Sequence, residues 1–128
     1  MKQFLNILVV GAGGFLGSVF RYLVSGALQK LSPEGVFPLG TLGVNVIGCL
    51  VIGLLAGAAE NMQVFGPQVR LFLFLGVLGG FTTFSSFGYE TMSMLRDGQA
   101  LAAMANVGLH VVAGLFAVWL GLTVTAAV

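Results

Sequence analysis

Four long apolar stretches fill almost the whole of this 128-residue chain and constrain its fold more than any other feature. A helix needs about 20 apolar residues to cross a hydrocarbon core about 30 Å thick. Polar and turn-forming residues, Pro33 and Gly98 among them, separate the stretches, as is typical of helix ends. The sequence therefore predicts an all-α integral membrane protein, a single membrane domain over residues 1–128. Its four transmembrane helices are expected at residues 4–28, 39–59, 71–95 and 100–128.

The composition excludes most other classes of protein. Only 7% of the residues are charged and 58% are hydrophobic, whereas about 25% of a soluble domain is charged. The net charge of +1 comes without a basic cluster, so we expect no nucleic-acid partner. Cys49 is the single cysteine and His110 the single histidine, which excludes an internal disulfide and a Cys/His metal cluster. We find no catalytic constellation and predict that the chain is not an enzyme.

The basic residues give little preference for one orientation in the membrane. With four spans, Lys2 and Arg70 fall on one side, and Arg21, Lys30 and Arg96 on the other. Orientation follows the Lys/Arg asymmetry of short loops, and two against three is a weak asymmetry. Either the chain inserts both ways and forms an antiparallel dimer, or Lys30 and Arg96 weakly set one orientation. A bundle of four helices fills its own centre, so a solute path is expected to involve more than one copy.

The third stretch contains an unusual segment, Gly79 to Gly88, with two adjacent glycines and two hydroxyl pairs. This composition disfavours a continuous helix. Irregular backbone at membrane depth is tolerated only inside protein or along a wet cavity. A break there would free carbonyl oxygens that suit an alkali or alkaline-earth cation. The alternative is a kinked helix whose Thr and Ser side chains bond to their own turn.

Phe81, Phe84 and Phe87 recur every three residues in the same segment. Such a stripe commonly contacts lipid or packs against other helices. The alternative interpretation uses the positive edge of an aromatic ring, which can meet a small anion without trapping it as a full positive charge would.

Other polar residues lie within the apolar stretches. The Asn45 amide can donate to an anion or join two helices. Asn106 and His110 are four residues apart and share one helix face, where they can line a hydrated path, or bond to each other and to a neighbour. Arg21 and Glu90 lie nearer the ends of their spans. Ionisable groups in such positions are functional candidates.

Several of these segments together resemble the Fluc (CrcB) family of fluoride channels over nearly the whole chain. The segments that carry the resemblance are Arg21-Tyr22, Gly40-Thr41-Leu42-Gly43-Val44-Asn45, Gly79-Gly80-Phe81-Thr82-Thr83-Phe84-Ser85-Ser86-Phe87 and Glu90-Thr91. The resemblance implies a passive, fluoride-selective channel in the cell (inner or plasma) membrane that exports cytoplasmic fluoride. It also implies a homodimer of antiparallel subunits with dual topology and two fluoride pathways.

The resemblance further assigns roles to individual residues. It implies a central structural Na⁺ held by the backbone carbonyls of Gly79 and Thr82 from each subunit, where the third helix breaks at mid-membrane. It places Arg21 near an aqueous vestibule and leaves the role of Glu90 open. Along the fluoride pathway it implies the ring edges of Phe84 and Phe87, a hydrogen bond from Asn45, and the hydroxyl groups of Ser85 and Ser86.

The chain departs from the family pattern at a few positions. Gly88 stands where a serine is common, which removes one hydroxyl donor. In the fourth span, Asn106, His110 and Gly114 stand where relatives often place Tyr and Ser along the pathway. Asn106 and His110 are expected to replace those donors, although a neutral histidine donates from one nitrogen only.

Two other functions remain as alternatives. A proton-coupled small multidrug exporter also has four short spans in an antiparallel dimer, but it needs a carboxylate deep in its first helix. Residues 4–28 contain none. A membrane assembly subunit without a pore would explain the glycines but not the cluster of Thr, Ser and Phe in the third span.

Overall fold

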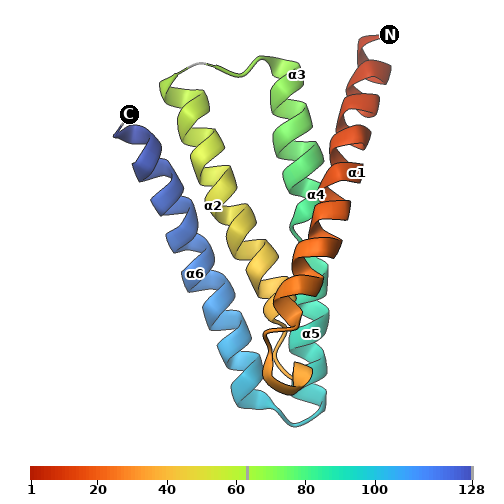
Figure 1. The fold of residues 1–128 in the computed structure, drawn as a ribbon, viewed down its shortest axis with the longest axis vertical. Coiled ribbons are helices and arrows are strands. Elements are labelled where there is room, and N and C mark those ends of the chain that lie inside the picture. Colours follow the sequence, from red (N-terminus) through yellow and green to blue (C-terminus); the bar gives the residue numbers. More distant parts are fainter. Residues whose placement is uncertain (63, 128) are drawn as a thin grey trace.

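The computed structural model describes residues 1–62 and 64–127, which form long helices along a common axis (Figure 1). Both chain ends lie at the same end of the molecule. In chain order the elements are α1 (Lys2–Gln29), the 3₁₀ turn η1 (Pro33–Gly35), α2 (Leu39–Asn61), α3 (Pro67–Arg70), the π-helix η2 (Leu71–Leu78), α4 (Gly79–Phe81), α5 (Phe84–Arg96) and α6 (Ala100–Ala126).

Four helical segments are long and apolar enough to cross a membrane, and the predicted all-α fold is confirmed. They span Lys2–Gln29, Leu39–Asn61, Pro67–Arg96 and Ala100–Ala126. The third begins at Pro67 rather than at residue 71, because proline is favoured in the first helical turn, where its missing N–H is not needed. The last residue of the expected fourth range, Val128, lies outside the described residues.

The helices associate in two main contacts. α2 packs along α6, and α1 packs along η2 and α4 (Figure 1). Glycine permits both: a Cβ at Gly17 of α1 would overlap the Val77 carbonyl of η2, and a Cβ at Gly121 of α6 would come within 2.6 Å of the Leu50 carbonyl of α2. Small residues of this kind let membrane helices approach to backbone contact.

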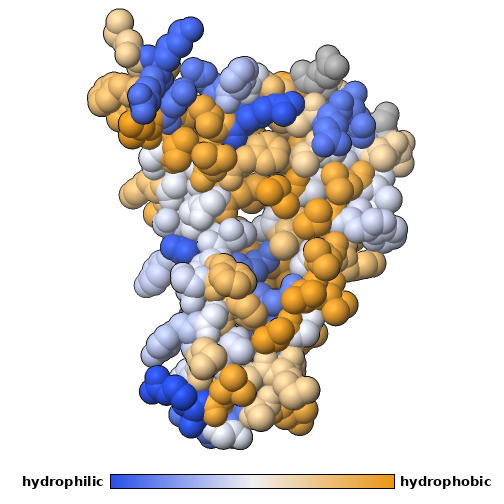
Figure 2. Space-filling view, turned by 180° about the vertical axis from the view of Figure 1, so that it is seen from behind, coloured by the Kyte–Doolittle hydropathy of each residue, from blue (hydrophilic) through white to orange (hydrophobic). Residues whose placement is uncertain are grey.

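The interior of a single chain is small, and large apolar side chains cover its outside. Val44 is fully buried and Phe81 is 8% exposed, whereas Phe15 is 69% and Leu101 81% exposed. Figure 2 shows strongly hydrophilic residues at the two ends of the long axis, with apolar residues and residues of intermediate hydropathy over most of the surface between them. The apolar surface is what a lipid bilayer or a second protein copy would cover.

The segment Pro67–Arg96 is interrupted at Thr82 and Thr83. Thr82 has φ −84° and ψ 158°, and Thr83 has φ −150° and ψ 108°, so both have extended backbone. Helical geometry resumes at Phe84. The interruption turns the peptide groups on either side away from their helical partners, and the polar residues of neighbouring helices meet there.

Candidate functional site

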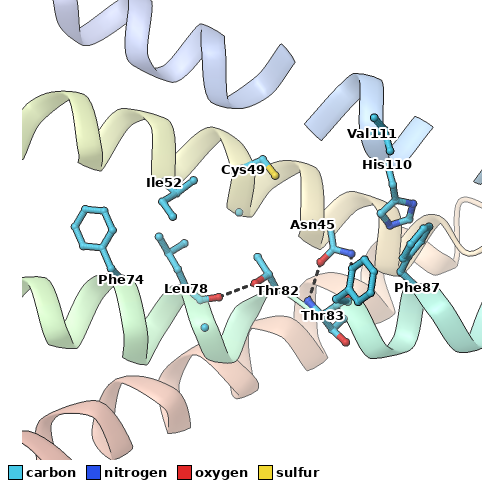
Figure 3. A pocket seen from close by; sticks show the side chains of 13 residues that line it. Asn45, Cys49, Ile52, Phe74, Leu78, Thr82, Thr83, Phe87, His110 and Val111 are labelled. Atoms are coloured by element: carbon cyan, nitrogen blue, oxygen red, sulfur yellow. Dashed lines mark hydrogen bonds between the residues drawn. The ribbon is translucent and has the colours of Figure 1, made fainter. Parts of the chain in front are cut away.

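Asn45 of α2 hydrogen-bonds to the backbone at the interruption through both ends of its amide. Its Oδ1 accepts from the Thr83 N–H at 2.8 Å, and its Nδ2 donates to the Thr83 carbonyl at 3.0 Å (Figure 3). In a continuous helix the Thr83 N–H would donate to the carbonyl of Gly79, four residues earlier. The side chain of Asn45 thus replaces a helical hydrogen bond and leaves the Gly79 carbonyl without that donor.

At the start of α5, the side chain of Thr83 likewise replaces a helical hydrogen bond. Its Oγ1 accepts from the Ser86 N–H at 3.2 Å, which makes Thr83 the N-cap of the helix. The Ser86 N–H would otherwise donate to the Thr82 carbonyl. Thr83 Oγ1 also donates to Ser86 Oγ at 2.9 Å and lies 3.4 Å from Ser85 Oγ. Because Ser86 Oγ accepts here, its own hydroxyl hydrogen is free to donate elsewhere.

The two carbonyls released in this way, those of Gly79 and Thr82, are the two that the family resemblance assigns to a sodium ion. Carbonyl oxygens are suitable ligands for a hard cation, so the residues present fit such an ion. Within residues 1–62 and 64–127 there is no cluster of His, Cys, Asp and Glu that would hold a metal instead. Two carbonyls are too few for a full shell, and further ligands would have to come from water or from another copy. The Arg21 guanidinium donates to the Thr82 carbonyl at 3.5 Å and would have to withdraw from a bound cation.

A cavity of about 430 Å³ lies beside the interruption, between α2, η2, α5 and α6. Four of the expected pathway residues line it and thus come together in space: Asn45, Phe84, Phe87 and His110 (Figure 3). Ser85, Ser86, Asn106 and Arg21 lie outside this lining. The other lining residues are Gly48, Cys49, Ile52, Phe74, Leu78, Gly79, Thr82, Thr83 and Val111.

The aromatic rings at the cavity are arranged as a tilted series. The Phe84 and Phe87 centroids are 5.4 Å apart with an interplanar angle of 52°, and the Phe87 and His110 centroids are 4.3 Å apart at 44°. Tilted rings expose edges as well as faces to their neighbours. Phe84 is 82% exposed in the single chain, so one side of its ring has no contact within this chain.

Asn106 has a different surrounding from the one expected of a pathway donor. It is fully buried, and its Nδ2 donates to Thr91 Oγ1 at 2.9 Å. Thr91 Oγ1 in turn donates to the Phe87 carbonyl at 2.8 Å. The backbone carbonyl of Asn106 also lies 2.9 Å from His110 Nδ1. Asn106 therefore joins α6 to α5 and orients His110 towards Phe87.

A second contact joins α2 to α5 one turn away from Asn45. Thr41 donates to the Glu90 carboxylate at 2.6 Å. Thr41 and Asn45 are four residues apart, so one face of α2 carries both side chains that reach α5. Sequence reasoning did not single out Thr41, Thr83 or Thr91. The i, i+4 spacing for Thr41, and the preference of threonine for a helix N-cap for Thr83, were the signals that could have found two of them.

Sequence comparison with known proteins identifies the family of this chain. The family model described as CrcB-like protein, Camphor Resistance (CrcB), matches residues 8–122. The fluoride-specific ion channel FluC of Methylobacillus flagellatus is 46% identical over 116 residues, which cover 91% of each chain. The protein of the same name from Chlorobium phaeobacteroides is 47% identical over 122 residues, 94% of this chain and 92% of the relative. That from Rhizobium meliloti is 45% identical over 123 residues, 95% of this chain and 97% of the relative. The chain is a multi-pass membrane protein that belongs to the CrcB-like family.

Proposed function

We propose that this protein is a fluoride-selective passive ion channel that exports cytoplasmic fluoride. The observation that carries the proposal is the cavity that gathers Asn45, Phe84, Phe87 and His110 beside a helix interruption. The names of its relatives, fluoride-specific ion channels at 46% and 47% identity, support the choice of ion. A channel moves an ion without covalent chemistry, so the proposal assigns no enzymatic reaction.

The cavity supplies weak partners for a small anion rather than one strong one. A fluoride path has to replace tightly bound water with donors and yet let the ion leave. One Asn45 N–H is used by the Thr83 carbonyl, and the second is available to an ion. The ring edges of Phe84 and Phe87 add further partners in the cavity. No lysine or arginine of the described residues lines the cavity, so the ion meets no fixed positive charge that would trap it.

Passive flow gives the channel a protective role. In acid surroundings fluoride enters cells as HF, which ionises in the neutral cytoplasm. The fluoride ion then leaves down its electrochemical gradient through the channel. This role places the protein in the cell (inner or plasma) membrane.

We infer that the working unit is an antiparallel homodimer of dual topology with two pathways. The ring of Phe84 is 82% exposed in one chain although it lies at the cavity, and a second copy would complete the wall on that side. Lys2 and Arg70 lie at one end of the helices, while Lys30 and Arg96 lie at the other. With Arg21 counted beside Lys30 and Arg96, the distribution is two against three, and this weak asymmetry is compatible with insertion in both orientations.

We also propose a structural sodium ion at mid-membrane between the two copies, held by the carbonyls of Gly79 and Thr82 from each. The release of both carbonyls from helical donors supports it. The test is the thermal stability of purified dimer in sodium and in a bulky organic cation at equal ionic strength. Equal stability in both solutions would count against the ion.

The function itself is tested by fluoride efflux from liposomes that hold the purified protein, read with a fluoride electrode. Valinomycin and internal potassium balance the charge, and chloride-loaded liposomes serve as the control. We expect fast loss of fluoride without loss of chloride. Absence of efflux from dimeric protein would overturn the channel proposal and leave the exporter and assembly functions to be tested.

The same efflux assay tests whether the ring edge of Phe84 acts on fluoride. We expect Phe84→Ile to lower fluoride efflux by about tenfold or more, because isoleucine fills the space but lacks a positive edge. Phe15→Ile is the matched control, since Phe15 is 69% exposed on α1 and lies outside the cavity lining. Unchanged efflux in Phe84→Ile would show that the edge does not act on the ion.

A further inference from the structure

The hydrogen bond at His110 fixes which of its ring nitrogens carries a proton in the neutral form. His110 Nδ1 lies 2.9 Å from the backbone carbonyl oxygen of Asn106. A carbonyl oxygen can only accept, so Nδ1 carries the hydrogen. The other nitrogen, Nε2, is then an acceptor with a bare lone pair.

Nε2 is buried and has no hydrogen-bond partner within residues 1–62 and 64–127. The imidazole ring lines the same cavity as Asn45 and Phe84 and lies against Phe87 (Figure 3). A buried polar atom without a partner is rare in proteins, and a bound water or ion or a functional role is among the explanations for it.

The sign of the interaction with an anion depends on the protonation of this nitrogen. The lone pair of a neutral Nε2 repels an anion, whereas an imidazolium offers an N–H donor and a positive charge. The Phe87 ring, 4.3 Å from the imidazole between centroids, can favour the cation through its negative face.

We propose that His110 binds the permeating anion only in its protonated form, so that fluoride conduction increases as the pH falls. This inference rests on the proposed fluoride channel and adds a proton-dependent residue to its pathway. The charge is transient, and neutral His110 at higher pH makes the path less favourable to the ion. The channel would then conduct best in the acid conditions under which HF enters a cell.

Other titratable or charged groups lie near the cavity, and their contribution to a dependence on pH has to be distinguished from that of His110. Cys49 of α2 lines the cavity, and Glu90 of α5 lies one turn beyond Phe87 with its carboxylate bonded to Thr41. Arg21 of α1 contacts the Thr82 carbonyl. Variants of Cys49 and Glu90 are therefore compared with variants of His110 to assign the proton.

The experiment is the fluoride current across planar bilayers at fixed total fluoride, measured from pH 8 to pH 5.5. HF is uncharged and carries no current, so the lipid leak does not contribute. We expect the wild-type current to increase about tenfold over this range, as the neutral imidazole gains its second proton. His110→Gln keeps a side-chain donor but cannot gain a proton, and its current is expected to be independent of pH.

Cys49→Ala and Glu90→Gln are the matched controls, and each is expected to retain the wild-type dependence on pH. His110→Asn serves as a second variant if His110→Gln does not yield dimeric protein in detergent. A wild-type current that does not change with pH, or a rise that His110→Gln retains, would overturn the inference while leaving the channel in place. Loss of the rise in Glu90→Gln would assign the proton to Glu90 and overturn it as well. Absence of fluoride current at every pH would instead contradict the proposed function.

Discussion

Helices meet in two different ways in this molecule, at the long helix pairs and at the interruption of the third span. Along α1–η2 and α2–α6 the contacts depend on missing side chains: Gly17 and Gly121 bring one backbone against another. At Thr82–Thr83 the contacts depend on side chains that take over backbone hydrogen bonds, mainly those of Asn45 and Thr83.

The contrast between glycine contacts and side-chain hydrogen bonds distinguishes what holds the helices together from what shapes the candidate site. Lipid is as apolar as the helix surfaces, so close van der Waals contact, and not hydrophobic burial, holds the helix pairs together. Such contacts tolerate no added volume, but they carry no chemistry. The interruption would expose unpaired peptide groups in a medium that cannot hydrate them, and each side chain that replaces a partner also determines which carbonyls remain available. Changes in the first region should affect assembly, and changes in the second should affect ion movement in protein that still folds.

The largest effect is expected from Gly17→Ala on α1. The new Cβ would overlap the Val77 carbonyl and approach the Phe81 nitrogen within 2.9 Å, and backbone atoms cannot move aside as a side chain can. We expect a loss of about 1–3 kcal/mol or more in stability, seen as a lower melting temperature and a lower yield of dimer in detergent.

Gly11→Ala is the control for this change, because it lies on the same helix and its Cβ would meet nothing within 4 Å. It gains the same helix propensity without the overlap. If Gly17→Ala were as stable as Gly11→Ala, the contact between α1 and η2 would be looser than its glycines indicate.

Asn45→Leu is expected to have the largest effect on conduction, whereas Gly17→Ala acts on assembly. It leaves the Thr83 N–H and carbonyl without their side-chain partner, at about 1–3 kcal/mol for each buried group left unpaired. It also removes the free amide N–H offered to the ion. We expect fluoride efflux per dimer to fall about 100-fold.

The control for Asn45 is Asn61→Ala on the same helix, which loses an exposed hydrogen bond to the Thr125 carbonyl. Its efflux should stay near the wild-type rate. Normal efflux in Asn45→Leu would mean that the interruption persists without its amide and that the ion does not use that N–H.

The long helices were predictable from the sequence and the partners at the interruption were not, for a physical reason. Hydrophobic length is a local property, so the four spans follow from counting residues, and only ends such as Pro67 shift. Asn45 and Thr83 are 38 residues apart, and nothing local indicates that an amide of one span bonds to the backbone of another. The π-helical backbone of η2 was likewise not predicted from the composition of the third span. The shared helix face of Asn106 and His110 was also visible in the sequence, but the bond from the Asn106 amide to Thr91 is a tertiary contact that the spacing does not indicate. The pathway role expected of Asn106 stays a prediction.

The smallest effect is expected from Thr83→Val, and it tests how the two regions depend on each other. Valine keeps the shape of threonine but loses the N-cap, so the Ser86 N–H is left to turn back towards the Thr82 carbonyl. Loss of a cap costs about 1 kcal/mol, which corresponds to about a fivefold change in an equilibrium constant. We therefore expect the sodium concentration that gives half of the sodium-dependent thermal stabilisation to rise about fivefold, while the melting temperature in saturating sodium changes little.

Thr83→Ser keeps the cap and should restore the wild-type value. Thr123→Val is the neutral control, because the Thr123 hydroxyl bonds only to carbonyls of its own helix turn. If Thr83→Val and Thr83→Ser required the same sodium concentration, the cap would not control access to the Thr82 carbonyl. The interruption would then be held by Asn45 alone, and its link to the cation would have to run through Gly79.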